Sequence, residues 1–501
     1  MDTLRRTLLI GNLKPLAKYF LYYSAPRCAL LRLATSAIAR AFRPHDRNLP
    51  QIVRDKIDII TALERTIERG LDRMHLDRRR WTRLFDKFSD VLSEGRSTAQ
   101  EFESKHGMPP PGFITLSPTQ VCNLHCVGCY AASAPGTKRS LSYSIVDRIV
   151  REQKELWGSH FTVISGGEPF MWRSEGRDIL DLVANHPDTF FLIFSNGTLI
   201  TEKLAARMAD AGNLTVAISV EGMEAETDAR RGKGVHRKIL GAFAILRDAG
   251  VPFGISITTT KLNIDTLLTD EPWNFYLEQQ GALYAWGFQY MPIGRAYTLE
   301  LMLTPQQRLA LFEKVWHLIR DKHYFVPDFW NCGTATGTRG GYLYINWDGE
   351  IMPCVFNPYS VGNIKDYYTN GGSLTDALFT PYFVAIRNWQ QHYIYDHRLD
   401  RAGDPESFCQ SRGSRAADTI SFHYGELISR VVESHVAQGQ AHAKLLSQRR
   451  GSSSRHRPAG VRNFNTDQIL SAEVLHQCDL TFKANPSVLV SPSEHTAPCR
   501  N

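Results

Sequence analysis

Strand-like and helical spacings of hydrophobic residues alternate through the middle of this 501-residue chain. Six short apolar runs predict strands, and longer stretches with helical periodicity separate them. The predicted strands are Phe113–Leu116, Phe161–Ser165, Phe190–Ser195, Leu214–Val220, Phe253–Thr260 and Tyr284–Tyr290. The clearest predicted helices are Leu141–Trp157, Ile200–Ala211, His236–Gly250 and Thr304–Lys322. Repeated strand–helix units imply parallel strands with right-handed crossovers. The predicted fold class is therefore α/β, a partial (β/α)6 barrel of the TIM type.

The flanking segments follow different patterns. Between Ile52 and Leu92 the apolar residues recur at helical spacing, which predicts an N-terminal helical region of two amphipathic helices. The Pro/Gly-rich stretch 107–112 then marks a domain boundary. Beyond the barrel, a strand at Tyr342–Trp347, an Asp-Gly turn and a strand at Glu350–Met352 predict a β-hairpin. Five segments are predicted. They are a basic amphipathic segment at 1–50, a helical region at 51–106, the partial barrel at 107–330, an extension with the hairpin and some helix at 331–446, and a flexible tail at 447–501.

The net positive charge of the chain lies in its first 47 residues, because basic and acidic side chains balance in the rest. The net charge is +7, and residues 1–47 alone carry nine basic and two acidic side chains. Charges interrupt every apolar run there, so no stretch reaches the length of a transmembrane helix or a secretory signal. The segment fits an anionic membrane surface, and it fits equally a basic helix packed on the barrel. Nucleic-acid binding is not expected, because no recognised nucleic-acid-binding fold accompanies the charge.

Three cysteines carry the strongest chemical signal. Cys122, Cys126 and Cys129 have the spacing Cys-x3-Cys-x2-Cys and follow the first predicted strand directly. Three thiolates on one loop can bind three irons of a cubic iron–sulfur cluster, which leaves the fourth iron open for chemistry. A structural zinc loop is the alternative, but zinc sites usually have a second cysteine or histidine pair, and none follows nearby. Because such clusters need reduced thiols, we expect a cytoplasmic location, with peripheral membrane contact on the inner face as an option.

The cysteine loop and the motifs after it resemble the radical S-adenosylmethionine (SAM) superfamily. The sequence Gly166-Gly-Glu-Pro169 ends the second predicted strand, as in that family, and Ser219-Val-Glu-Gly222 ends the fourth. Family members often have Ser-x-Asp-Gly at the end of the fourth strand, so Glu221, which stands in the position of that Asp, is a mild departure. The resemblance implies that the Gly-Gly-Glu-Pro turn, with the Glu168 carboxylate, binds the amino group of SAM, and that Arg231 meets its carboxylate. The cofactor-binding residues that it implies are Gly166, Gly167, Glu168, Asn196, Ser219, Arg231 and Thr258.

The predicted hairpin and Pro353-Cys354 resemble the SPASM extension of radical SAM enzymes, which holds auxiliary iron–sulfur clusters. Cys332, Cys354 and Cys409 are the candidate ligands. Relatives have more cysteines in a dense run, so the resemblance allows at most one auxiliary cluster here, with a fourth ligand from elsewhere or from the substrate.

This resemblance implies an enzyme that reductively cleaves SAM at a 4Fe–4S cluster to a 5′-deoxyadenosyl radical, with hydrogen abstraction from a substrate. No acid, base or nucleophile is required of the side chains. The expected partners are an electron donor such as a flavodoxin or ferredoxin, and a substrate that is a peptide or a lipid or isoprenoid. The alternative is a non-catalytic iron–sulfur or zinc protein derived from this fold, which the intact Gly-Gly-Glu-Pro turn argues against.

Overall fold

The structure is a computed structural model of the full chain. It describes residues 50–73, 95–295, 298–326, 328–329, 341–356, 360–384 and 387, with single positions between 23 and 36 and at 82 and 86. These residues all belong to one compact unit, Met1–Ala417. The predicted tail and the candidate ligands Cys332 and Cys409 lie outside the described residues.

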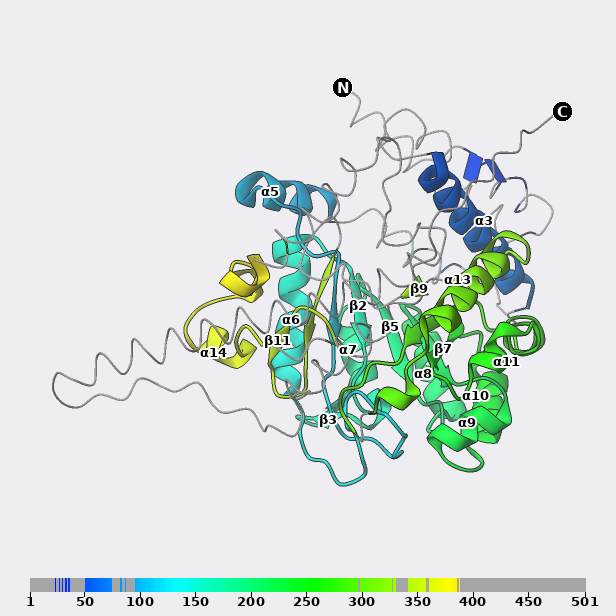
Figure 1. The fold of residues 1–501 in the computed structure, drawn as a ribbon. Helices are drawn as coiled ribbons and strands as arrows, with labels where there is room; N and C mark the ends of the chain where they lie inside the picture. Colours follow the sequence, from blue (N-terminus) through cyan, green and yellow to red (C-terminus); the bar gives the residue numbers. More distant parts are fainter. Residues whose placement is uncertain are drawn as a thin grey trace, which may run out of the picture. The chain divides into compact units, whose positions relative to one another are not determined.

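A curved sheet of nine strands forms the centre of this unit, and eight of its strands run parallel (Figure 1). The six predicted strands are confirmed, with ends within one residue of the prediction. Their order in the sheet follows the chain, from β1 to β8. They are β1 Phe113–Leu116, β2 Phe161–Ile164, β5 Phe190–Ser195, β6 Leu214–Val220, β7 Phe253–Thr259 and β8 Ala285–Gln289.

Two further parallel strands extend this sheet at its ends. On one side β9 (Asp328–Phe329) pairs with β8, and on the other β10 (Tyr342–Ile345) pairs with β1. The hairpin predicted for the C-terminal extension therefore joins the barrel sheet, and its second strand, β11 (Ile351–Met352), is antiparallel to β10. Among the described strands, β9 and β11 have a partner on one side only, so the barrel is partial. A separate two-stranded ribbon pairs β3 Arg173–Ser174 with β4 Arg177–Asp178.

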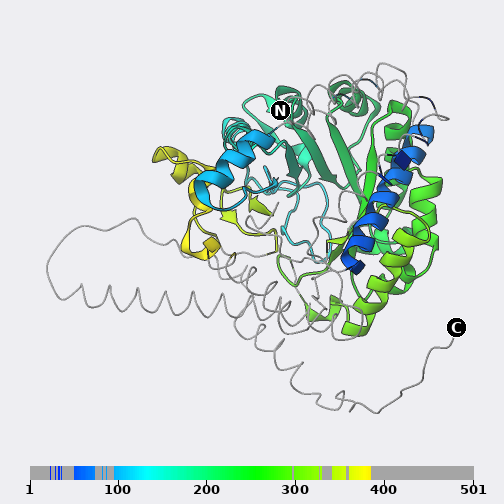
Figure 2. The ribbon, with the colours of Figure 1, turned by 90° about the horizontal axis from the view of Figure 1, so that it is seen from above.

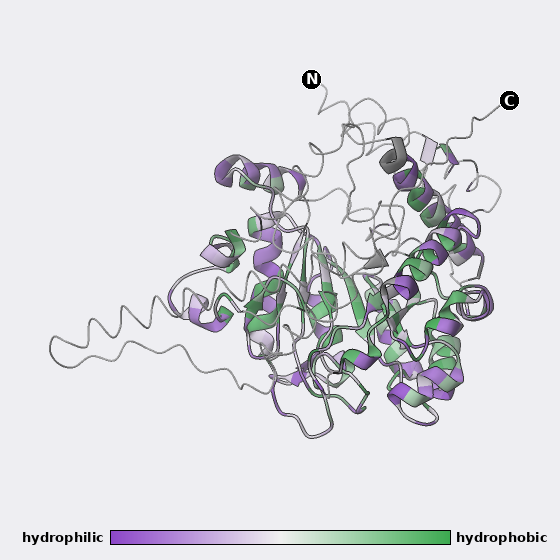
Figure 3. Ribbon diagram, in the orientation of Figure 1, coloured by the Kyte–Doolittle hydropathy of each residue, from purple (hydrophilic) through white to green (hydrophobic). Residues whose placement is uncertain are grey.

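Amphipathic helices lie round the outer side of the sheet (Figure 2). Their apolar faces pack inward, so the hydrophobic colour gathers on the strands and the inner faces of the helices (Figure 3). Thr304 caps α13 with a capping box to Gln307, as the Thr-Pro start predicts. The helices are α6 Tyr143–Trp157, α7 Ile179–Asn185, α8 Glu202–Ala211, α9 Glu224–Arg231, α10 Val235–Ala249, α11 Ile264–Leu268, α12 Glu271–Asn274, α13 Pro305–Arg320, α14 Ile364–Thr369 and α15 Leu374–Ala377.

Of the two helices predicted between Ile52 and Leu92, the first is α3 Pro50–Arg73, and most of the second lies outside the described residues. The region also contains α5 Arg96–His106. Helix α3 is bound to the barrel by ion pairs from Arg320 of α13 to Asp55 and Asp58. Arg27, in the basic segment, is 2% exposed and forms an ion pair with Asp72 at the end of α3. At Arg27 the basic segment therefore contacts helix α3. In the described part of the chain, no helix is long and apolar enough to cross a membrane.

Candidate cluster and cofactor site

Side chains that are distant in sequence surround one cavity of about 200 Å³ at the carboxyl ends of the strands. Active sites of α/β barrels form at this face because the connections that follow the strands meet there. All three cysteines of the loop line the cavity, and so do most of the predicted cofactor residues. Those in its lining are Cys122, Cys126, Cys129, Gly166, Gly167, Asn196, Ser219, Arg231 and Thr258.

The cysteine loop crosses the mouth of the barrel and is fixed by backbone contacts. Arg295, after β8, donates from its backbone N–H to the carbonyl of Cys129 (3.0 Å) and from Nη1 to that of Cys126 (3.0 Å). Gly128 has φ = +62°, and a Cβ there would lie 2.7 Å from the ring of Tyr290. A glycine is therefore needed between Cys126 and Cys129, because any side chain would push the loop off Tyr290.

Burial opposes ionisation of two of the three thiols. Burial raises the pKa of Cys122 to about 11 and also raises that of Cys126, where the positive charge of Arg231 acts in the opposite direction. Bound iron would displace the thiol protons. In the described residues, no three Cys, His, Asp or Glu side chains are gathered round a single-ion site. All three cysteines line one cavity, and thiolates that each bind a different iron need not meet at a single ion, so the arrangement is compatible with a 4Fe–4S cluster, whose ligands stay a prediction.

The Gly166-Gly167 turn lies directly against the chain that leads into the cysteine loop. Gly167 donates from its backbone N–H to the carbonyl of Thr119 (2.8 Å), and Glu168 donates likewise to Val121 (2.8 Å). A Cβ on Gly167 would lie 2.1 Å from the Val121 oxygen. The sequence predicts glycines here for close approach to a ligand. The structure shows a second reason, which is close approach of two backbones.

Glu168 is the one predicted cofactor residue that does not line the cavity. Its side chain is fully buried, and its carboxylate accepts hydrogen bonds from Ser195 Oγ (2.9 Å), Asn196 N (2.8 Å) and Phe170 N (3.2 Å). Burial raises the pKa of this carboxyl to about 7, although the three donors act to lower it. In this conformation Glu168 joins the Gly-Gly turn to the end of β5, and its contact with an ammonium group stays a prediction.

Asn196, which donates to Glu168 from its backbone, also forms hydrogen bonds to the loop of the first cysteine. Its side-chain amide donates to Cys122 Sγ (3.8 Å) and to Asn123 Oδ1 (2.8 Å). Asn123 in turn donates to Thr198 Oγ1 (2.8 Å). The Asn-Gly-Thr segment, which from sequence could be a simple turn, is therefore hydrogen-bonded to the loop that carries Cys122.

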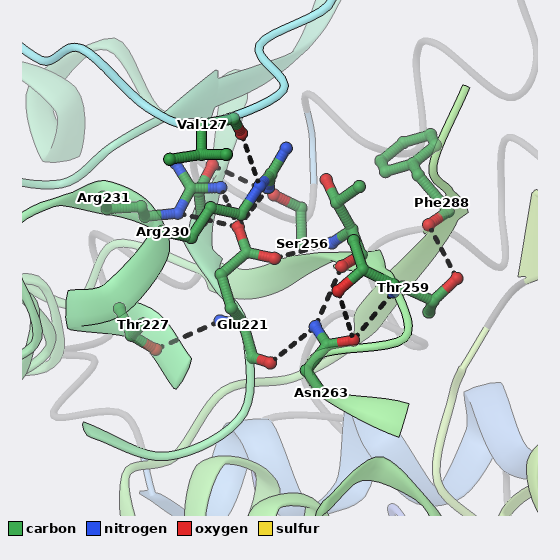
Figure 4. A network of polar contacts seen from close by, with 12 residues as sticks. Val127, Glu221, Thr227, Arg230, Arg231, Ser256, Thr259, Asn263 and Phe288 are labelled. Atoms are coloured by element: carbon green, nitrogen blue, oxygen red, sulfur yellow. Dashed lines mark hydrogen bonds and ion pairs between the residues drawn. The ribbon is translucent and has the colours of Figure 1, made fainter. Parts of the chain in front are cut away.

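A buried carboxylate with two arginines was not predicted from the sequence (Figure 4). Glu221, at the end of β6, pairs with Arg230 and with Arg231 through its Oε1. Its Oε2 accepts from the backbone N–H of Thr258 on the neighbouring strand (3.2 Å). The signal was the departure at Glu221 from the Asp that the family often has, together with the Arg-Arg pair nine residues later.

Part of the cavity lining is aromatic. Edge-to-face or tilted contacts run from Tyr130 to Phe356 (centroids 5.9 Å apart), from Phe356 to Phe288 (6.3 Å) and from Phe288 to Phe194 (5.5 Å). All four rings line the cavity. We call these four residues the aromatic arc. It offers a large apolar side chain a surface beside the cluster and cofactor residues.

Cys354 lies just behind the cavity wall. It is buried, and its Sγ accepts hydrogen bonds from Tyr342 OH (3.1 Å) and from Phe356 N (3.4 Å). Its neighbours Val355 and Phe356 line the cavity. Because Cys332 and Cys409 lie outside the described residues, the ligand set of an auxiliary cluster stays a prediction.

Comparison with known proteins agrees with this geometry. The model of the radical SAM superfamily matches residues 116–270, and an iron–sulfur cluster-binding domain, SPASM, matches 337–397. The mycofactocin maturase MftC of Mycolicibacterium smegmatis is 34% identical over 293 residues, which cover 56% of this chain and 71% of the relative. The chain belongs to the radical SAM superfamily. It is an enzyme of this superfamily with a SPASM extension, and a 4Fe–4S cluster and SAM are its cofactors.

Two other similar proteins have names that indicate a different reaction or a different partner from the mycofactocin maturase. An AdoMet-dependent heme synthase of Methanosarcina barkeri is 25% identical over 293 residues, which cover 51% of this chain and 80% of that protein. The crystal structure of SuiB from Streptococcus suis with its precursor peptide SuiA aligns over 58% of this chain and 70% of that one, with 16% identity and a TM-score of 0.47.

Proposed function

We propose that this enzyme reductively cleaves SAM and modifies a peptide by hydrogen-atom abstraction from a residue with a large apolar side chain. When bound, the cluster and SAM supply a 5′-deoxyadenosyl radical that takes a hydrogen atom from the substrate. The observation that carries the proposal is the shared cavity. Three thiols, the Gly-Gly turn, Arg231 and the aromatic arc all line it.

Each group has a separate role in this proposal. Cys122, Cys126 and Cys129 would hold three irons of the cluster. Arg231 would bind the SAM carboxylate, because a guanidinium has five N–H donors and its bonds to Glu221 through Nε and Nη2 do not use all of them. The aromatic arc would exclude water and hold the substrate side chain against the cofactor side of the cavity. A flavodoxin-like or ferredoxin-like donor would supply the electron.

A peptide substrate is favoured by the names of the relatives. Besides the mycofactocin maturase, the sporulation killing factor maturation protein SkfB of Bacillus subtilis is 27% identical over 270 residues. The lipid alternative rests on the basic segment 1–47. At least one basic residue of that segment has a role within the protein, because Arg27 forms an ion pair with Asp72.

The test uses the anaerobically reconstituted enzyme with SAM, dithionite and short peptides encoded beside its gene. The proposal predicts 5′-deoxyadenosine and a mass change in a peptide at an aromatic or branched aliphatic residue. A peptide deuterated at that residue should transfer deuterium to 5′-deoxyadenosine. Transfer from an isoprenoid or acyl lipid, and from no peptide, would overturn the peptide assignment.

A further inference from the structure

Two consecutive arginines at the end of α9 share one carboxylate and both line the cavity, and Arg230 also bonds to the cysteine loop. Glu221 Oε1 accepts from both Arg230 and Arg231, and the side chains of the three residues are 1%, 15% and 11% exposed, respectively. Two guanidiniums on one carboxylate leave a surplus positive charge in a nearly dry environment. Such a surplus is stabilised when an anionic group binds beside it.

Arg230 is the arginine that contacts the cysteine loop (Figure 4). Its Nε donates to the carbonyl of Val127 (3.2 Å), and the N–H of Val127 donates to the carbonyl of Arg230 (3.0 Å). Val127 lies between Cys126 and Cys129, and its side chain is 48% exposed. Packing of that side chain therefore contributes little to holding the tip of the loop, and the two bonds to Arg230 act there together with those from Arg295 to Cys126 and Cys129.

Arg231 lines the cavity, as Arg230 also does. It donates to Glu221 through Nε (2.8 Å) and Nη2, and it lines the cavity together with Cys126. Glu221 connects the two arginines to the sheet, since its Oε2 accepts from Thr258 N on β7 and its backbone carbonyl accepts from Asn263 Nδ2 (2.7 Å).

We propose that Arg230 is a positioning residue that fixes the cysteine loop for the cluster, a task separate from the binding of the anionic end of SAM that the proposed function gives to Arg231. Glu221 holds both arginines in register with the end of β6. The part that concerns Arg231 rests on the proposed function, whereas the part that concerns Arg230 does not. A lysine cannot replace Arg230, because a single ammonium does not offer the planar set of donors that reaches Val127 O and Glu221 together.

The experiment compares Arg230→Lys with Arg231→Lys, which keep the charge of each residue and act as controls for one another. The reconstituted proteins are challenged anaerobically with an iron chelator, and SAM affinity is measured by equilibrium dialysis. A lost charge-assisted hydrogen bond corresponds to about a ten-fold effect. We expect Arg230→Lys to lose iron about ten-fold faster with nearly unchanged SAM affinity. Arg231→Lys should bind SAM about ten-fold more weakly and lose iron at the wild-type rate.

A second measurement separates this proposal from the proposed function. In the metal-free protein without SAM, hydrogen exchange of the amides in residues 122–129 should be faster in Arg230→Lys and unchanged in Arg231→Lys. Glu221→Gln should show both defects. Equal effects of the two lysine variants on loop exchange, or unchanged exchange in Arg230→Lys, would overturn the assignment of Arg230, even if the enzyme made no 5′-deoxyadenosine. Unchanged SAM affinity in Arg231→Lys would overturn the assignment of Arg231.

Discussion

The backbone N–H of Asn196 donates a 2.8 Å hydrogen bond to the buried carboxylate of Glu168. This bond joins the Gly-Gly turn after β2 to the end of β5, and Asn196 in turn reaches Cys122. In Glu168→Gln one carboxylate oxygen becomes an NH2 group, which cannot accept from an N–H or O–H. We expect the metal-free protein to lose about 1–3 kcal/mol in its free energy of unfolding. SAM affinity should fall as well, because the turn lines the cavity.

Urea unfolding and SAM titration check this expectation. Glu202→Gln, on the exposed surface of α8, is the matched control and should change neither quantity. A Glu168→Gln variant with wild-type stability and wild-type SAM affinity would contradict the role of this carboxylate in the site.

The same carboxyl predicts a pH dependence of stability. Burial raises the pKa of Glu168 from its ordinary 4.5 to about 7. Between these values the native protein binds more protons than the unfolded chain, so the free energy of unfolding falls as the pH rises. The contribution is fully present below about pH 4.5 and is lost as the pH passes 7. Its upper limit is roughly 3 kcal/mol. Other groups titrate in this range, so the measurement is the difference between wild type and Glu168→Gln from pH 4.5 to 7.5. A constant difference would contradict the raised pKa.

Gly167→Ala tests the contact between the turn and the chain before Cys122. The new Cβ would meet the Val121 oxygen at 2.1 Å and the carbonyl carbon of Gln120 at 2.7 Å, and backbone atoms cannot move aside cheaply. We expect a loss of more than about 2 kcal/mol in the free energy of unfolding. Gly241→Ala in α10 is the control, because nothing lies within 4 Å of its Cβ. It should be neutral or stabilise by up to about 1 kcal/mol. Similar unfolding curves for the two variants would show that the backbone around Gly167 can move to accommodate the Cβ at little cost, which would contradict this prediction.

The sequence predicts the strands of the barrel well because they depend on short-range patterns. The apolar runs from Phe113 to Tyr290 are buried strands at their predicted places. By contrast, β10 pairs with β1 across more than 200 residues, and no local pattern encodes that register. The same limit applies to side-chain direction. The position of Glu168 after its strand is evident from sequence, but its turn toward Ser195 and Asn196 depends on the neighbouring strand. The salt bridges of Glu221 likewise arise only once α9 folds back onto β6.

The basic segment 1–47 leads to a prediction about membrane binding. Polybasic attraction contributes about 1 kcal/mol for each Lys or Arg near an anionic surface, and salt screens it. We expect the full chain to sediment with anionic liposomes at low salt and to be partly released at high salt. A chain that starts at Leu49 should stay in the supernatant and still cleave SAM, because α3 keeps its ion pairs with Arg320. Equal partitioning of the two proteins, or misfolding of the shorter one, would instead indicate that the segment packs on the barrel, as Arg27 does.

The most direct test concerns Cys122, Cys126 and Cys129. The account requires all three thiols for the cluster at which SAM is cleaved, so their joint replacement by Ala should abolish 5′-deoxyadenosine formation under dithionite. Wild-type protein, purified and reconstituted without oxygen, should contain iron and sulfide and form this product. Cys478→Ala, at a cysteine to which the sequence gives no role, should behave like wild type. The measurement is 5′-deoxyadenosine by mass spectrometry. Formation of 5′-deoxyadenosine by the triple variant at the wild-type rate would contradict the central claim.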